Sequence, residues 1–339
     1  MLYHLLPQLS DVHIIFNLFR YQTFRAAGAV VTALLVSFLL GPATIRWLRR
    51  LRFGQVIRTE GPTTHFEKAG TPTMGGVLII LAVLTAALLA GGASPVVRFG
   101  LGALVAFGAI GLWDDLLAVR RNRNLGLRAR ERLALQTAAG LFLGWWAAAS
   151  SWIGTTMTLP VLGVANLGPA YAVVAALLFV GFANAVNLTD GLDGLAAGLV
   201  AVASVGFVAL ALRARQADGA VLAVAVSAAA AAFLTLNAHP ARLFMGDVGS
   251  NALGAVLAAL ALITKAEVAL MVIGGVFVAE AASVLLQVAY FKSTGGRRIF
   301  RMSPLHHHFE LVGWPETRIV QRFYWAGSIC LLVGLLIAG

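Results

Sequence analysis

The chain has 339 residues, of which 60% are hydrophobic and only 12% are charged, and its formal net charge is +11. Soluble domains carry roughly 25% charged residues, so this composition excludes a soluble globular protein. Its apolar runs are about 20 residues long, enough to cross ~30 Å of hydrocarbon as helices. We therefore predict an all-α integral membrane protein in which residues 1–339 form a single polytopic membrane domain.

Ten apolar runs are predicted to cross the membrane as helices. They lie near residues 24–48, 73–92, 96–119, 132–150, 170–187, 193–212, 219–236, 250–264, 266–291 and 320–338. The segment before the first run lacks a basic region and a small-residue cleavage site, so we expect the first span to act as an uncleaved signal. Most of the 25 Lys and Arg residues fall in one set of alternate loops. The positive-inside rule places these loops in the cytoplasm and both termini outside. Because topology explains the positive charge, we expect no nucleic-acid partner.

Most of the 14 acidic residues fall in the same inner loops or at the inner ends of the spans. A transporter or lipid flippase would instead place ionisable groups near mid-bilayer, often in two related halves, and the sequence shows no such repeat. A non-catalytic scaffold would have no use for so many carboxylates at one surface. The sequence therefore predicts a functional site in a cleft at the cytoplasmic face of the membrane.

The third span ends in the motif "WDDLLAVRRNRN" (113–124), in which Asp114 and Asp115 are adjacent. Neighbouring residues on a helix point about 100° apart. The two carboxylates can therefore serve one site only if the helix end frays or a cation bridges them. The alternative is a belt of charges at the membrane edge.

The fifth and sixth spans are joined by "AVNLTDGLDGLA" (185–196), which contains Asp190 and Asp193. These residues share one helix face if the sixth span begins near Thr189. The amides of Asn184 and Asn187 precede them. The alternative, in which Asp190 caps a helix N-terminus, explains only one of the two carboxylates.

The eighth span is preceded by "FMGDVGSNALG" (244–254), with Asp247 between two glycines. Such a small-residue loop can offer main-chain N–H groups and the positive end of a helix dipole to an anion. Capping of the helix by Asp247 is the alternative.

Three consecutive histidines, His306, His307 and His308, lie in "RRIFRMSPLHHHFE" (297–310). Zinc sites usually draw on spaced ligands, and adjacent histidines after Pro304 cannot easily all face one ion. With three arginines just upstream, the pattern favours an anion-binding turn. Since carboxylates that hold Mg²⁺ attract phosphate, the four motifs together indicate phosphate chemistry on a lipid-linked substrate.

These motifs resemble those of the polyprenyl-phosphate N-acetylhexosamine-1-phosphate transferase family. The resemblance covers "GQVIRTEGPTTHFEKAGTPTMGG" (54–76), "DD" (114–115), "NAVNLTDGLDGLA" (184–196), "NAHPARLFMGDVGS" (237–250) and "MSPLHHHFELVGWPETRIVQRFYW" (302–325). The HHHFE block resembles the phospho-N-acetylmuramoyl-pentapeptide transferase branch rather than the branch that uses UDP-GlcNAc, which remains the nearest rival. The resemblance implies a ten-span enzyme of the bacterial cytoplasmic membrane with its active site facing the cytoplasm. It implies transfer of phospho-MurNAc-pentapeptide from UDP-MurNAc-pentapeptide to undecaprenyl phosphate, in peptidoglycan synthesis. The products are lipid I and UMP, and Mg²⁺ is required.

The resemblance also suggests roles for individual residues. Asp247 resembles the Mg²⁺ ligand, and Asp114 and Asp115 resemble an acidic pair in which Asp114 is the candidate base for the lipid phosphate. The nucleotide-binding edge corresponds to Asn187, Asp190 and Asp193. The nucleoside pocket corresponds to Lys68, Thr73, Asn237, Phe244 and Gln287. The triad expected to engage diphosphate or sugar is His306, His307 and His308.

One position departs from the family pattern, and several alternatives stay open. The acidic pair normally begins a D-D-x-x-K pattern, whereas this chain has Ala118 in place of the lysine; we expect Arg120 or Arg121 to supply the charge, in a different geometry. We favour direct attack by the lipid phosphate over a covalent phosphosugar intermediate on a carboxylate. We also leave open whether the protein forms a homodimer.

The ninth run, residues 266–291, is long for one crossing and contains Gly274–Gly275 and Glu280. We predict a tilted or broken helix that opens a groove for the isoprenoid tail. The alternative is an ordinary tilted span in which Glu280 pairs with a neighbour.

Overall fold

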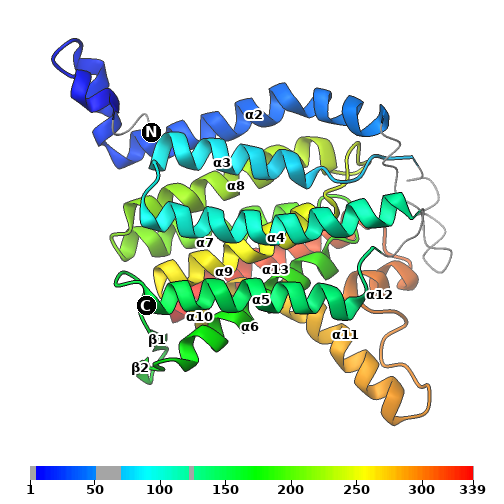
Figure 1. Ribbon diagram of the computed structural model, residues 1–339. Coiled ribbons are helices and arrows are strands. Elements are labelled where there is room, and N and C mark those ends of the chain that lie inside the picture. Colours follow the sequence, from blue (N-terminus) through cyan, green and yellow to red (C-terminus); the bar gives the residue numbers. More distant parts are fainter. Residues whose placement is uncertain (1–4, 51–69, 122–125, 339) are drawn as a thin grey trace.

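Residues 5–50, 70–121 and 126–338 are described by a computed structural model, and most of them are helical (Figure 1). The elements before the hairpin are η1 (Leu6–Leu9), η2 (Ile14–Arg20), α2 (Gln22–Arg50), α3 (Gly76–Gly91), α4 (Pro95–Arg120) and α5 (Ala129–Ala149). A short antiparallel hairpin of β1 (Thr156–Leu159) and β2 (Gly163–Asn166) pairs Thr156 with Asn166. The elements after it are α6 (Ala170–Thr189), α7 (Leu195–Arg213), α8 (Ala217–Asn237), α9 (Gly246–Thr264), α10 (Glu267–Ile273), α11 (Gly275–Ser293), α12 (Leu305–Val312) and α13 (Glu316–Ile337).

Each of the ten predicted spans coincides with a helix, the ninth being divided between α10 and α11. Among the described residues, eight helices are long and apolar enough to cross a membrane: α2, α4, α6, α7, α8, α9, α11 and α13. Helix α3 is apolar but has 16 residues, and α5 carries Glu131 in its first turn. The predicted all-α, multi-pass membrane fold is confirmed.

Helix α9 lies in the middle of the bundle and packs against α3, α4, α6 and α7 (Figure 1). Every residue from Val248 to Ile263 is buried. Small residues allow this close packing, as is common between membrane helices. A Cβ atom on Gly111 of α4 would lie 2.1 Å from the carbonyl oxygen of Asp247, and one on Gly254 would lie 2.3 Å from that of Phe182 on α6. The start of α9 is thereby held directly against the end of α4.

The predicted break in the ninth span is confirmed. Helix α10 ends at Ile273 and α11 begins at Gly275, with Gly274 at the junction, and α11 diverges from the bundle beyond it (Figure 1). A Cβ atom on Gly274 would lie 2.5 Å from the ring of Phe182 and 3.0 Å from the carbonyl oxygen of Leu270. Glycine at this junction therefore allows α6 to pack against the bend.

The connections that carry the sequence motifs gather at one end of the bundle, which we call the site end. It comprises residues 126–128, 190–194 and 238–245 and helix α12 (Figure 1). The β1–β2 hairpin lies at the opposite end (Figure 1). The predicted alternation of loops between two faces is thus confirmed.

The prediction that Asp190 and Asp193 share a helix face is wrong. Helix α6 continues to Thr189, and Asp190 is its C-cap rather than the N-cap of the next helix. Helix α7 begins only at Leu195, after Gly194, whose φ of +82° lies in the left-handed region that favours glycine. Both carboxylates therefore lie on a loop between the two helices, which frees them to face different partners.

Candidate active site

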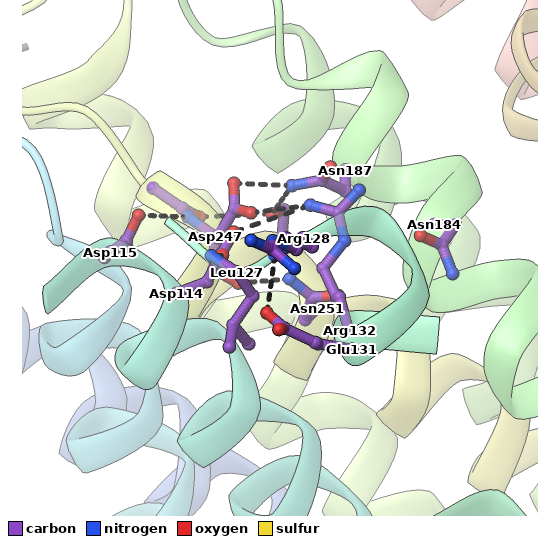
Figure 2. Close-up of polar contacts among 12 residues, drawn as sticks. Asp114, Asp115, Leu127, Arg128, Glu131, Arg132, Asn184, Asn187, Asp247 and Asn251 are labelled. Atoms are coloured by element: carbon purple, nitrogen blue, oxygen red, sulfur yellow. Dashed lines mark hydrogen bonds and ion pairs between the residues drawn. The ribbon is translucent and has the colours of Figure 1, made fainter. Parts of the chain in front are cut away.

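The site end is centred on Asp247, which lies in the first turn of α9. This helix begins at Gly246, four residues before the predicted start of the span at residue 250. One carboxylate oxygen of Asp247 accepts a hydrogen bond from Arg132 of α5 at 3.0 Å (Figure 2). The same guanidinium nitrogen lies 3.6 Å from Asp114 of α4. Asp114 is buried, and it also accepts the main-chain N–H of Leu127. Two carboxylates from different helices therefore face one position, which the Arg132 guanidinium now occupies.

A chain of amides fixes the other side of Asp247. Asn187 of α6 donates to the second Asp247 carboxylate oxygen at 2.8 Å (Figure 2). Asn251 donates to the Asp247 carbonyl and accepts from Gln136 of α5, at 2.7 Å in each bond. Asn184 donates to Gln136 in turn. Since Gln136 and Asn251 are fully buried, these bonds orient Asp247 by connecting three helices in an apolar environment.

Asp115 points in a different direction from Asp114, as expected for adjacent residues, which project about 100° apart on an intact helix. Its two carboxylate oxygens accept the main-chain N–H groups of Asp247 and Val248 at 3.2 and 3.1 Å. The residue at the N-cap position of α9, Met245, provides no side-chain cap. Asp115 therefore caps α9 from the neighbouring helix α4, and it positions Asp247 rather than facing the carboxylate pair.

We expect Asp115→Ala to lower the free energy of unfolding by about 1–2 kcal/mol, because two N–H groups at the start of α9 lose their acceptor. Asp115→Asn keeps one acceptor oxygen and should have a smaller effect. Thermal unfolding in detergent checks both variants. Equal midpoints for Asp115→Ala and the unmodified protein would contradict the capping role.

Thr73 and Phe244 lie next to the cluster formed by Asp114, Arg132 and Asp247. The segment before α3 pairs with the segment before α9, because Gly75 donates to the Phe244 carbonyl and Phe244 donates to the Pro72 carbonyl, at 2.8 and 2.9 Å. Thr73 lies against Gly246, the residue before Asp247. Lys68, predicted for the same pocket, lies outside the described residues.

Asp190 and Asp193 lie beside the Asp247 cluster on the α6–α7 loop, and their surroundings differ. Burial, followed by the nearby Asp247 and Asp193 carboxylates, raises the pKa of Asp190 to about 7. Near neutral pH the Asp190 carboxyl is therefore protonated in a substantial fraction of molecules, and in that form it can donate a hydrogen bond to a ligand.

Asp193, His239 and Glu316 each offer a ligand atom, all within 4.8 Å of one another. His239 Nδ1 lies 3.2 Å from Asp193 and 3.4 Å from Glu316. Main-chain donors also bind these carboxylates: Ala241 N–H donates to Asp193, and Asp193 N–H donates to Glu316. The three residues thus join the α6–α7 loop, the α8–α9 loop and the start of α13.

Asn237 and Gln287, which were predicted for the nucleoside pocket, support loops of the site end. Asn237 is buried, accepts from Gly194 N–H at 3.1 Å and donates to the Leu243 carbonyl. Gln287 of α11 accepts from the N–H groups of Ile299 and Phe300 at 3.0 Å. The first bridges two site loops, and the second holds the segment that leads to α12.

The three histidines of α12 have three different neighbours, which agrees with the expectation that adjacent histidines cannot share one ion. His306 is fully buried and faces Glu280 of α11. His307 lies 2.7 Å from Glu310, and His308 accepts from the main-chain N–H of Arg301 at 3.1 Å. His307 and His308 are partly buried.

The sequence did not single out Arg132, Gln136 or Asn251. It suggested Arg120 or Arg121 in place of the family lysine, yet both are exposed, and Arg132 provides the positive charge between the carboxylates. A usable signal was present for the other two: Gln136 and Asn251 are polar residues inside apolar helices, and such residues seldom lack a function or a partner.

Comparisons with known proteins find similar sequences over nearly the whole chain. The family model described as glycosyl transferase family 4 matches residues 97–265, and the phospho-N-acetylmuramoyl-pentapeptide-transferase signature 1 matches residues 68–80. The phospho-N-acetylmuramoyl-pentapeptide-transferase of Desulforapulum autotrophicum is 43% identical, over 99% of this chain and 98% of its own length. The protein of that name from Desulfatibacillum aliphaticivorans is 46% identical, over 98% and 97%. That of Heliobacterium modesticaldum is 49% identical, over 93% and 98%.

Proposed function

The chain belongs to the phospho-N-acetylmuramoyl-pentapeptide-transferase family, and we propose that the Asp114–Arg132–Asp247 cluster is where it transfers phospho-MurNAc-pentapeptide from UDP-MurNAc-pentapeptide to undecaprenyl phosphate. The observation that carries the proposal is the convergence of two carboxylates and a guanidinium at the start of α9. The products are lipid I and UMP. The site end faces the cytoplasm, as the arginines concentrated there indicate.

The residues of the cluster fit Mg²⁺. Asp114 and Asp247 offer hard carboxylate oxygens that face one position, and such oxygens are the ligands that Mg²⁺ prefers. The Asp193–His239–Glu316 group fits less well, because it includes an imidazole and main-chain N–H groups already bind its carboxylates. Held by Asp247, Mg²⁺ would neutralise charge on the donor diphosphate. Arg132 would then be free to bind a phosphate oxygen with its planar fork.

The reaction forms a bond between an oxygen of the lipid phosphate and the β-phosphorus of the donor. The bond from that phosphorus to the bridging oxygen breaks, and UMP leaves with the electron pair. Asp114 is the proposed base for the lipid phosphate, although the demand for a base is small, since the second pKa of a phosphate monoester is ~6. Positioning and electrostatic stabilisation by Arg132 then supply most of the acceleration.

Release of UMP by the purified protein in detergent tests the function. Undecaprenyl phosphate and Mg²⁺ are supplied with either UDP-MurNAc-pentapeptide or UDP-GlcNAc, and we expect release with the muramoyl donor only. Release with UDP-GlcNAc alone would move the chain to the sister branch. Direct attack also requires that no UMP is released without the lipid; a stoichiometric burst in its absence would indicate a covalent intermediate.

The outer face of α11 is proposed to contact the isoprenoid tail. Several large apolar side chains of α11 are exposed beyond the bend, including Leu285 and Leu286. Gly274, by contrast, is enclosed by Phe182, so added bulk there would disturb the packing of α6 before it reached a lipid.

We expect the double variant Leu285→Ala/Leu286→Ala to raise the KM for undecaprenyl phosphate about three- to tenfold, because dispersion contacts with the tail are lost. The KM for the UDP donor should not change. Leu336→Ala on α13, an equally exposed apolar position, is the matched control. The measurement is the initial rate against the mole fraction of lipid in mixed micelles; an unchanged lipid KM would exclude α11 as the contact.

A further inference from the structure

We propose that Glu280 is a positioning residue for the reaction: from α11 it holds the first turn of α12 and thereby places the three histidines relative to the α6–α7 loop. Glu280 is fully buried and lies on the segment just beyond the bend at Gly274. The proposal rests on the proposed function, because its test measures release of UMP.

The first contact is made with the main chain of α12. This helix begins at Leu305, and Pro304 at its N-cap position provides no side-chain acceptor. Oε1 of Glu280 accepts the N–H of His306 at 3.2 Å, as a helix N-cap residue would. Asp115 does the same for α9. The helices that carry Asp247 and the three histidines are thus each capped by a carboxylate from a neighbouring helix.

The second contact is made with the His306 ring. Oε1 of Glu280 also lies 3.3 Å from His306 Nδ1. On the other side of the ring is Gly191 of the α6–α7 loop, where an added Cβ atom would lie 2.2 Å from His306 Nε2. His306 is therefore wedged between α11 and the loop that carries Asp190 and Asp193. The position of Glu280 sets the distance between that loop and α12.

Substitutions at Glu280 can distinguish a positioning role of its carboxylate oxygen from a role of its charge. A buried carboxylate is costly unless hydrogen bonds satisfy it, and packing alone would be served by an apolar side chain of similar size. If Glu280 acts by placing an acceptor oxygen, its reach matters and its charge does not. Glu280→Gln keeps the reach and removes the charge, whereas Glu280→Asp keeps the charge and withdraws the oxygen by one methylene.

The test compares these two variants with Ser283→Ala, a matched control. Ser283 is buried one turn further along α11, and its hydroxyl donates only to the Glu280 carbonyl within the same helix. We expect kcat for UMP release to stay within about threefold of the unmodified protein in Glu280→Gln and Ser283→Ala. In Glu280→Asp it should fall about 10- to 100-fold, since small misplacements at an active site have effects of that size. The KM for the UDP donor should change less than threefold.

Two results would overturn the proposal. The first is a larger loss of kcat in Glu280→Gln than in Glu280→Asp, which would indicate that the charge matters. The second is a kcat within threefold of the unmodified protein in both variants. Hydrogen–deuterium exchange of the peptide 301–312 provides a readout that does not depend on activity. It should accelerate in Glu280→Asp and stay unchanged in Glu280→Gln. If the unmodified protein releases no UMP, the proposed function fails, whereas unchanged exchange in Glu280→Asp refutes the positioning role alone.

Discussion

Asp247→Asn is expected to lower kcat for UMP release by about 10²- to 10³-fold. The substitution removes the negative charge at the centre of the cluster, where Arg132 and Asn187 converge, and losses of this size follow removal of one strong electrostatic contact at a reacting centre. The amide oxygen of asparagine can still accept from Asn187, so folding should be preserved. The rate is measured at saturating donor and lipid over a range of Mg²⁺ concentrations, and the concentration needed for half-maximal rate should rise.

Glu131→Gln is the control for this experiment. Glu131 directly precedes Arg132 in the first turn of α5, and its carboxylate accepts only the N–H of Arg128 among the hydrogen bonds of the described residues (Figure 2). Loss of this exposed charge should leave the rate unchanged. Equal rate losses in Glu131→Gln and Asp247→Asn would show that general charge, rather than the cluster, is responsible.

Arg132→Ala is expected to lower kcat about 10²-fold, because the donor diphosphate loses the guanidinium proposed to bind one of its oxygens. Arg132→Lys keeps a point charge without the planar fork, and its kcat should lie between those of Arg132→Ala and the unmodified protein. Ala118 lies four residues after Asp114, and therefore on the same face of α4. Ala118→Lys introduced into the Arg132→Ala protein should recover about tenfold in kcat.

The Arg132→Ala/Ala118→Lys double variant tests whether a lysine on α4 can replace the positive charge of Arg132. Recovery by Ala118→Lys would show that Arg132 performs in this chain the role of the lysine that its family pattern places at position 118. If kcat is unaffected by Arg132→Ala, the guanidinium is not part of the reacting site. If kcat falls and Ala118→Lys restores nothing, a charge from α4 cannot replace one from α5.

Much of the fold could be predicted because it depends on local pattern. Each long apolar run became a helix, and the break at Gly274 followed from a pair of glycines in an overlong run. The different directions of Asp114 and Asp115 followed from the helix repeat. The loop at 190–194 was missed, since Gly194 adopts a left-handed backbone that delays the start of α7 and nothing in the spacing of the carboxylates signals it.

The composition of the site was less predictable because it depends on tertiary contacts. Arg132 and Asp247 are 115 residues apart in the chain, and Arg132 is one of several arginines in its segment. Only the packing of α5 against α6 and of α4 against α9 distinguishes it from Arg120 and Arg121. In the same way, the sequence shows Glu280 only as an acidic residue inside an apolar run. Its contact with α12 appears only in the folded protein.

The central claim is that the donor diphosphate binds between α4, α5 and α9. A structure of the protein with UDP-MurNAc-pentapeptide and Mg²⁺, prepared without lipid acceptor so that no transfer occurs, tests it most directly. We predict density for the metal in contact with Asp247 and a phosphate in contact with Arg132. Diphosphate and metal at the Asp193–His239–Glu316 group, with Asp247 and Arg132 still paired to each other, would contradict the account.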